Sequence, residues 1–151
     1  MTSTTTRTSS ALLLILCAAI YLPARRAGGT TPEGFQLIAN PANPTTSVDV
    51  SFVRDAYLKR QAVWDNGETI RPIDLTSRFP ARETFTHDVL QKTLAQLRVY
   101  WNQQIFSGKG VPPPEVDSEA AMIAYVMARR GAIGYLPANA SLGGTKLLSL
   151  H

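Results

Sequence analysis

The chain has 151 residues, of which 44% are hydrophobic and 17% are charged. These values are typical of one globular domain and exclude a disordered or low-complexity chain. The formal net charge of +4, from 15 Lys and Arg against 11 Asp and Glu, gives no support for nucleic-acid binding, because most of the excess lies in an N-terminal leader.

The leader, residues 1–29, has the pattern of a secretory signal peptide. A Thr/Ser tract with the single charge Arg7 precedes an apolar run at residues 11–22, and small residues follow at 27–29. The run is shorter than the roughly 20 apolar residues that a membrane span needs. Two arginines at 25–26 lie beside the cleavage region, so an uncleaved membrane anchor stays open as an alternative.

We therefore predict an exported α/β domain over residues 30–151 with a periplasmic or secreted location. Three of the 15 Lys and Arg residues lie in the leader, which leaves 12 against 11 acidic residues and a net charge of +1. Nucleic acid is not expected as a partner at this charge. The single cysteine, Cys17, also lies in the leader, so the domain has no disulfide framework and no thiolate metal site.

The first elements of the domain are a buried strand and a helix. Residues 35–39 predict the strand, and the loop at 40–47 has two prolines, which exclude a helix there. Ser47 or Asp49 can cap a helix at residues 48–58. Its expected buried face comprises Phe52, Val53, Ala56 and Tyr57. The Asn66-Gly67 pair then predicts a turn.

The stretch at residues 69–90 is central to the functional prediction. A short strand ends near Asp74, a polar loop follows, and Pro80 suits the first position of a helix. A helix start offers free N–H groups to an anion, and Thr76, Ser77, Arg78 and Arg82 lie beside this one. Ordinary α/β connectivity, with capping hydroxyls and solvated arginines, is the alternative interpretation.

The second half of the domain continues the alternation of helices and strands. Helical spacing predicts helices at residues 93–106 and 119–128, and residues 132–136 and 146–150 predict strands. Glu115-Val116 is expected to pair at a sheet edge. The expected buried face of the first helix comprises Leu94, Leu97, Tyr100, Trp101 and Ile105. The element order predicts an α/β fold with a mixed sheet flanked by helices.

The residues themselves predict no catalytic chemistry. Neither Gly-x-Ser-x-Gly nor His-Glu-x-x-His occurs, and His87 and His151 are too far apart to suggest a metal site. We predict that the protein is not an enzyme and has no metal or cofactor. Trp64 and Trp101 are expected in the core rather than on a ligand platform.

Five features in order resemble the phosphate-type substrate-binding proteins of ABC transporters. They are Ile38-Ala39-Asn40-Pro41, Val53-Arg54-Asp55-Ala56-Tyr57-Leu58-Lys59, Trp64 before Asp65-Asn66-Gly67, Tyr100-Trp101 with Phe106-Ser107-Gly108-Lys109-Gly110, and Gly131-Ala132-Ile133-Gly134-Tyr135. The resemblance covers residues 35–136. It implies a single lobe of the type II periplasmic-binding-protein fold that binds a small inorganic anion such as phosphate, with an ABC permease or envelope protein as partner.

The chain departs from the family at the expected ligand site. Full-length relatives hold the oxyanion with an arginine and a Ser-Gly-Thr run in the loop at 76–82, and they close two lobes over it. Here Ser-Gly-Thr is absent, Arg78 or Arg82 would substitute for the arginine, and the length suffices for one lobe. The candidate ligand residues are Thr76, Ser77, Arg78 and Arg82, with Asn43 and Ser47 from the loop after the first strand and Gly134.

Two functional hypotheses follow from these departures. The first is a solute-binding protein that holds its anion weakly, or tightly only with a partner, because exposed charge pairs contribute about 0–1 kcal/mol each. The second is a lobe that has lost its ligand and acts as a protein-interaction or sensor module in the cell envelope.

Overall fold

The computed structural model describes Met1 and residues 34–151. The predicted signal peptide, apart from Met1, and the domain boundary at residue 30 lie outside the described residues. Within residues 34–151, no helix has both the length and the apolar character needed to cross a membrane.

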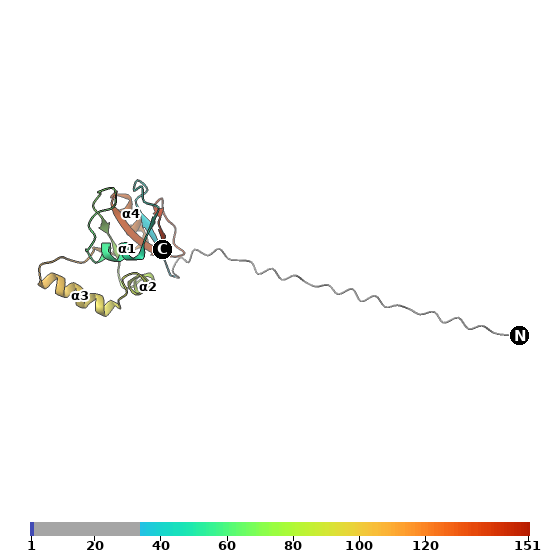
Figure 1. Cartoon of the computed structure of the whole chain (residues 1–151), viewed down its shortest axis with the longest axis horizontal. Coiled ribbons are helices and arrows are strands. Elements are labelled where there is room, and N and C mark those ends of the chain that lie inside the picture. Colours follow the sequence, from blue (N-terminus) through green and yellow to red (C-terminus); the bar gives the residue numbers. More distant parts are fainter. Residues whose placement is uncertain (2–33) are drawn as a thin grey trace.

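A four-stranded sheet with the order β3-β6-β1-β7 organises the fold (Figure 1). The central strand β1 (Phe35–Ala39) is antiparallel to both β6 (Ala132–Pro137) and β7 (Lys146–Leu147), whereas β3 (Arg71–Pro72) is parallel to β6. The sheet is therefore mixed, which confirms the predicted fold class.

Two short parallel pairs lie outside this sheet. The strand β2 (Ser47–Val48) pairs with β8 (Ser149–Leu150), and β4 (Asp74–Leu75) pairs with β5 (Glu115–Val116). The second pair confirms both the strand predicted to end near Asp74 and the pairing predicted for Glu115-Val116. It also joins the loop before α2 to a segment about 40 residues later in the chain.

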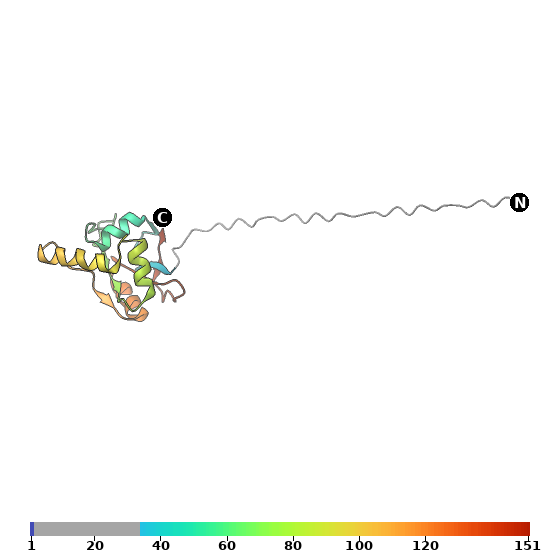
Figure 2. The same cartoon turned by 90° about the horizontal axis from the view of Figure 1, so that it is seen from below.

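Helices cover both faces of the sheet. The helices α1 (Val50–Tyr57) and α2 (Pro80–Asp88) lie on one face, and α4 (Glu119–Met127) lies on the other (Figures 1 and 2). Pro80 is in the first turn of α2, as predicted. The face of α2 predicted to be buried, Phe85, Val89 and Leu90, is at most 2% exposed.

An aromatic cluster joins α1 and α2 to the sheet. The Phe85 ring stacks on Tyr135 of β6 with centroids 4.0 Å apart and meets Phe35 of β1 edge to face at 5.3 Å. The Tyr57 hydroxyl donates to the backbone carbonyl of Ile73 at 2.9 Å. Because Tyr135 belongs to this cluster, its position is set by the core.

The neighbouring residue of β6, Gly134, faces α4 instead. A Cβ added there would lie 2.5 Å from the Met122 sulfur and 2.9 Å from Cγ2 of Ile73. Glycine is thus required because α4 packs directly on the strand, and protein side chains occupy the space that a ligand would need.

The helix α3 (Leu94–Phe106) projects from the body at its C-terminal end (Figures 1 and 2). Its buried residues are Leu97 and Trp101, near the body, whereas Ile105 is 49% and Phe106 is 91% exposed. The predicted burial of Ile105 is wrong, because the apolar spacing continues past the point where α3 leaves the body.

Candidate functional site

The loop between β4 and α2 is tied to β5. The backbone N–H of Thr76 donates to the Val116 carbonyl at 3.0 Å, and the Phe79 N–H donates to the Thr76 carbonyl at 3.2 Å. The first bond continues the β4–β5 pairing and the second closes a turn just before α2, so the first turn of α2 lies close to Glu115. The predicted anion site therefore borders an acidic residue from a distant part of the sequence.

Arg82 lies in the first turn of α2 and points inward. Its side chain is only 9% exposed and forms an ion pair with Asp74 of β4, whose side chain is 4% exposed. The Nη2 atom of Arg82 is also 3.3 Å from Oε1 of Glu115. A buried charge is strongly destabilising unless it is paired, so the two carboxylates account for the inward position of Arg82.

Asp74 is held in place by two further donors. Its Oδ1 atom accepts hydrogen bonds from the Tyr135 hydroxyl and from the Leu75 N–H, the latter at 3.0 Å. Burial raises the pKa of Tyr135 to about 12, although the nearby Arg82 charge acts in the opposite direction. The hydroxyl therefore keeps its proton at neutral pH and remains a donor to Asp74.

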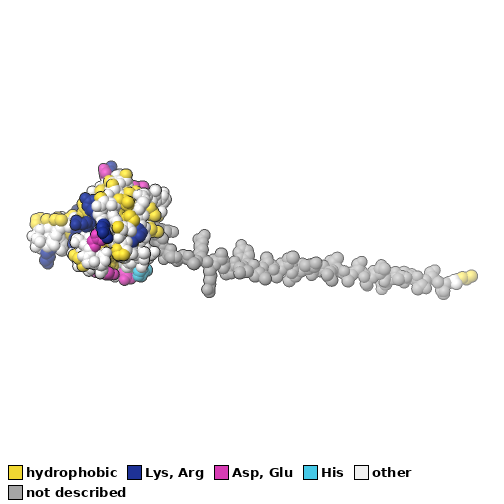
Figure 3. Space-filling model, turned by 90° about the horizontal axis from the view of Figure 1, so that it is seen from above, with side chains coloured by type: hydrophobic (Ala, Val, Ile, Leu, Met, Phe, Trp, Pro, Cys, Tyr) yellow, Lys and Arg dark blue, Asp and Glu magenta, His cyan; other side chains and the backbone are white. Residues whose placement is uncertain are grey.

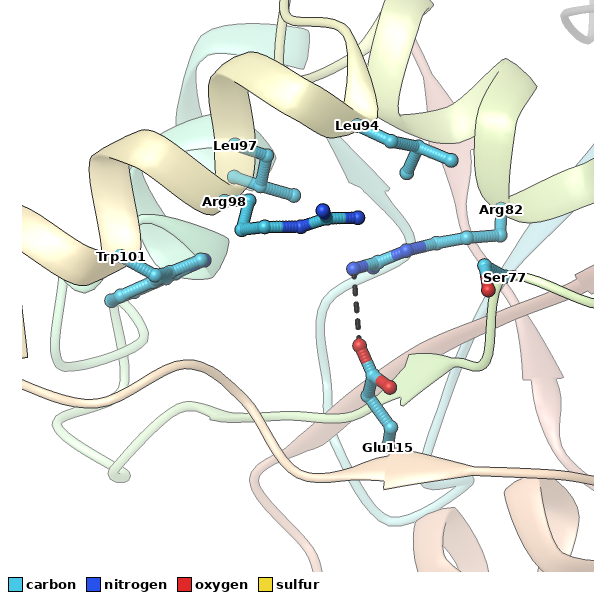
Figure 4. A pocket seen from close by; sticks show the side chains of 7 residues that line it. All are labelled: Ser77, Arg82, Leu94, Leu97, Arg98, Trp101 and Glu115. Carbon is cyan, nitrogen blue, oxygen red and sulfur yellow. Dashed lines mark hydrogen bonds and ion pairs between the residues drawn. The ribbon is translucent and has the colours of Figure 1, made fainter.

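A pocket of about 310 Å³ lies beside this network, between α2, α3 and β5. Figure 4 shows its lining, which consists of Ser77, Arg82, Leu94, Leu97, Arg98, Trp101 and Glu115. Arg82 reaches into it from α2 and Arg98 from α3, and Glu115 lies on the β5 side. With Ser77 from the loop before α2, four separate parts of the chain thus line one pocket.

Arg98 contributes a positive charge that the rest of the described chain does not neutralise. Among residues 34–151, its side chain has no carboxylate within 4.0 Å and no hydrogen bond. Figure 3 shows Lys and Arg side chains gathered where the projecting part of the molecule joins the body. Arg98, rather than the paired Arg82, is the residue best able to attract an anion into the pocket.

The structure brings two of the predicted ligand residues, Ser77 and Arg82, into this pocket. Thr76 lies next to Ser77, but its hydroxyl oxygen is buried and has no hydrogen-bond partner among residues 34–151. Arg78 points to the surface, where Nη2 is 3.4 Å from Oδ2 of Asp117 and both side chains are exposed.

The other three predicted ligand residues lie elsewhere. Asn43 is buried, and its Oδ1 accepts from the Thr45 N–H at 3.0 Å, which stabilises the loop after β1. Ser47 belongs to β2 and lines a different hollow, with Trp64 and His151. Gly134 contacts α4 in the core, as described above, and does not line the pocket.

Sequence reasoning missed Asp74, Arg98, Trp101 and Glu115 as members of the site. The spacing of Arg98 and Trp101, three residues apart on a predicted helix, places both on one helix face and is a signal that could have paired them. Asp74 and Glu115 left no such signal, because the β4–β5 pairing that brings them near Arg82 depends on the tertiary fold.

The described residues contain no group of three or more His, Cys, Asp or Glu side chains that could hold a metal ion. The pocket itself offers two guanidinium groups, one carboxylate, one hydroxyl and an apolar wall from α3. Such a set can bind and orient a solute through charge, hydrogen bonds and apolar contact.

Comparison with solved structures reveals a shared fold. An ABC-type phosphate transport receptor from Vibrio cholerae superposes with a TM-score of 0.59 at 16% identity, over 78% of this chain and 46% of the receptor. The chain therefore shares the fold of part of this receptor. A putative phosphate ABC transporter substrate-binding protein with bound phosphate from Clostridium perfringens matches this chain similarly, with a TM-score of 0.61 at 16% identity, over 78% of this chain and 45% of the other.

A third match, PstS from Borrelia burgdorferi, has a TM-score of 0.59 at 14% identity over 79% of this chain and 47% of its own. This chain thus spans about half the length of each of these structures. No protein-family model and no curated protein matches the sequence. At these identities the likeness establishes the fold, and the ligand has to be argued from the pocket.

Proposed function

We propose that this protein is an exported, non-enzymatic solute-binding lobe that binds a small oxyanion in the pocket between α2, α3 and β5. The observation that supports the proposal best is Arg98, an arginine without an internal partner in residues 34–151, beside a hollow of about 310 Å³. The printed names of the similar structures make phosphate the first oxyanion to test.

The charges of the pocket predict weak binding by the isolated lobe. Arg82 is already paired with Asp74 and Glu115, so an incoming anion gains mainly from Arg98. An exposed charge pair contributes only about 0–1 kcal/mol. We therefore expect dissociation constants on the order of millimolar, which correspond to about −4 kcal/mol.

A partner that covered the pocket would strengthen this binding. Excluding water lowers the effective dielectric constant around Arg98 and the anion, and each charge interaction then becomes stronger. An ABC permease or another envelope protein is the partner that we propose for this role.

Isothermal titration with inorganic phosphate tests the proposed site. Arg98→Ala should weaken binding about fivefold, the ratio that corresponds to about 1 kcal/mol. Arg130→Ala is the matched control, because Arg130 is also exposed but lies 3.9 Å from Glu68, away from the pocket. Equal loss of affinity in the two variants would refute the proposal, and so would the absence of heat with phosphate and with every other small oxyanion tested at millimolar concentration.

A further inference from the structure

We propose that the pocket selects, among small oxyanions, a singly charged carboxylate joined to an apolar body in preference to inorganic phosphate. This inference rests on the proposed function, because it concerns the ligand class of the same pocket. It follows from three features of the lining: the apolar wall of α3, the position of Arg98 within that wall, and the carboxylate on the opposite side.

The wall consists of Leu94, Leu97 and Trp101, all from α3. Inorganic phosphate is polar on every side and would leave this wall in contact with water. A ligand with an apolar body would remove water from both surfaces, and this contribution grows with the apolar area that is buried. The composition of the wall therefore favours an amphipathic ligand over a fully hydrated one.

Arg98 lies in the middle of the wall along the helix. It is four residues after Leu94 and three residues before Trp101, a spacing that makes all three neighbours on one helix face; Figure 4 shows its side chain between theirs. Guanidinium presents two parallel N–H donors that match a carboxylate. A carboxylate bound to Arg98 would thus place its attached body against Leu94 or Trp101.

The β5 side of the pocket, opposite α3, disfavours a second negative charge on the ligand. Glu115 lies there with its side chain 49% exposed, and the Arg82 that it contacts at 3.3 Å is also paired with buried Asp74. Arg82 carries one positive charge against these two carboxylates, so a doubly charged anion would meet a net negative charge on this side, with only Arg98 to offset it. A singly charged ligand whose far end is uncharged avoids this repulsion.

The test is isothermal titration of the full chain with phenylacetate, its neutral amide phenylacetamide, acetate and inorganic phosphate at neutral pH. We expect phenylacetate to bind at least about tenfold more tightly than either acetate or phosphate, a ratio that corresponds to about 1.4 kcal/mol. Phenylacetamide should bind more weakly than phenylacetate. Arg98→Gln should remove most of this difference, whereas Arg130→Gln should leave it unchanged.

A second variant tests the role of the opposite side. Glu115→Gln removes the carboxylate and releases one nitrogen of Arg82, so phosphate should gain more affinity than phenylacetate does. Circular dichroism establishes that each variant is folded before titration. Arg98 and Glu115 are both solvent-exposed, and in Glu115→Gln the buried Arg82 keeps its ion pair with Asp74.

The outcomes separate this inference from the proposed function. Phosphate binding that equals or exceeds phenylacetate binding would overturn the inference and leave the oxyanion site standing. Equal affinity for phenylacetate and phenylacetamide would also overturn it, since the carboxylate would then have no role. Absence of binding by all four compounds at millimolar concentration would overturn both.

Discussion

Arg82 is a charged side chain that the fold buries almost completely, at 9% exposure, against an Asp74 side chain that is 4% exposed. Bringing two charges out of water costs several kcal/mol for each ion, and the pair is tolerated only where further hydrogen bonds complete it. The Tyr135 hydroxyl and the Leu75 N–H supply these bonds to Asp74. These hydrogen bonds therefore stabilise the buried ion pair, and the ion pair fixes the position of Arg82 at the pocket.

Replacing Asp74 alone should destabilise the fold more than replacing Asp74 and Arg82 together. Asp74→Leu leaves Arg82 buried with only half-exposed Glu115 as counter-charge, and we expect a loss of about 3–5 kcal/mol in the free energy of unfolding. The double variant Asp74→Leu/Arg82→Leu should be more stable than Asp74→Leu alone. Urea unfolding of the two single variants and the double variant measures this coupling, and strictly additive losses would contradict it.

For single residues, the sequence predicted which loop contributes to the site but not the contacts that its side chains make. Arg82 and Ser77 were expected at the site because they lie beside a helix start, and both line the pocket. Whether an arginine there faces solvent or the interior depends on where Asp74 and Glu115 lie in space. Arg78, only four residues earlier, points outward to Asp117, and local sequence pattern does not distinguish the two arginines.

Among the elements, α3 matters most for the pocket, because it supplies four of the seven lining residues. Its start is stabilised by a capping box in which the Thr93 hydroxyl accepts from the Gln96 N–H at 3.2 Å and the Gln96 side chain accepts from the Thr93 N–H at 2.8 Å. Leu94 and Arg98 lie within the first two turns, so the order of this end of α3 determines the shape of the wall.

Removing the cap should destabilise α3 measurably. Thr93→Ala loses one of the two reciprocal bonds, and we expect about 1 kcal/mol of lost stability. Ser51→Ala is a suitable control, because Ser51 is an exposed residue of α1 whose hydroxyl makes no hydrogen bond within residues 34–151. Urea unfolding should give a change within about 0.5 kcal/mol for the control, and a similar change for Thr93→Ala would contradict the prediction.

Most elements were predictable because local signals and the tertiary fold agree. Pro80, the start of α4 at Glu119 and the strand residues 35–39 each appear where the sequence places an element boundary or a buried strand. The exposure of Ile105 was not predictable, because its helical spacing is the same as that of Leu97 and Trp101. Leu97 and Trp101 pack against the rest of the domain, whereas Ile105 lies on the projecting end of α3. The spacing of apolar residues in the sequence does not show where the helix leaves the domain.

For the molecule as a whole, two buried tyrosines predict sensitivity to alkali. Burial raises the pKa of Tyr135 to about 12 and holds the pKa of Tyr57 well above its usual value of 10.0. Between pH 10 and 12 the unfolded chain loses these protons while the folded protein keeps them, so stability is complete below pH 10 and falls as pH rises. Each pKa unit corresponds to about 1.4 kcal/mol.

Urea unfolding at pH 8, 10 and 11 measures this dependence. The parent protein should lose stability steeply above pH 10, and Tyr135→Phe should lose less over the same interval, although it starts from a lower value because its bond to Asp74 is gone. An equal loss in both proteins above pH 10 would show that Tyr135 does not contribute. The difference between the two slopes isolates this tyrosine from Tyr57.

The positions of the two tryptophans give the protein a built-in optical readout. Trp64 is buried away from the pocket and donates its ring N–H to the Gly131 carbonyl at 3.0 Å, whereas Trp101 forms part of the pocket wall. A solute that displaces water from the pocket wall alters the surroundings of the Trp101 indole. The Trp64 indole is unaffected and acts as an internal reference. Fluorescence emission can therefore report occupancy without any added label, and Trp101→Phe silences the signal at its source.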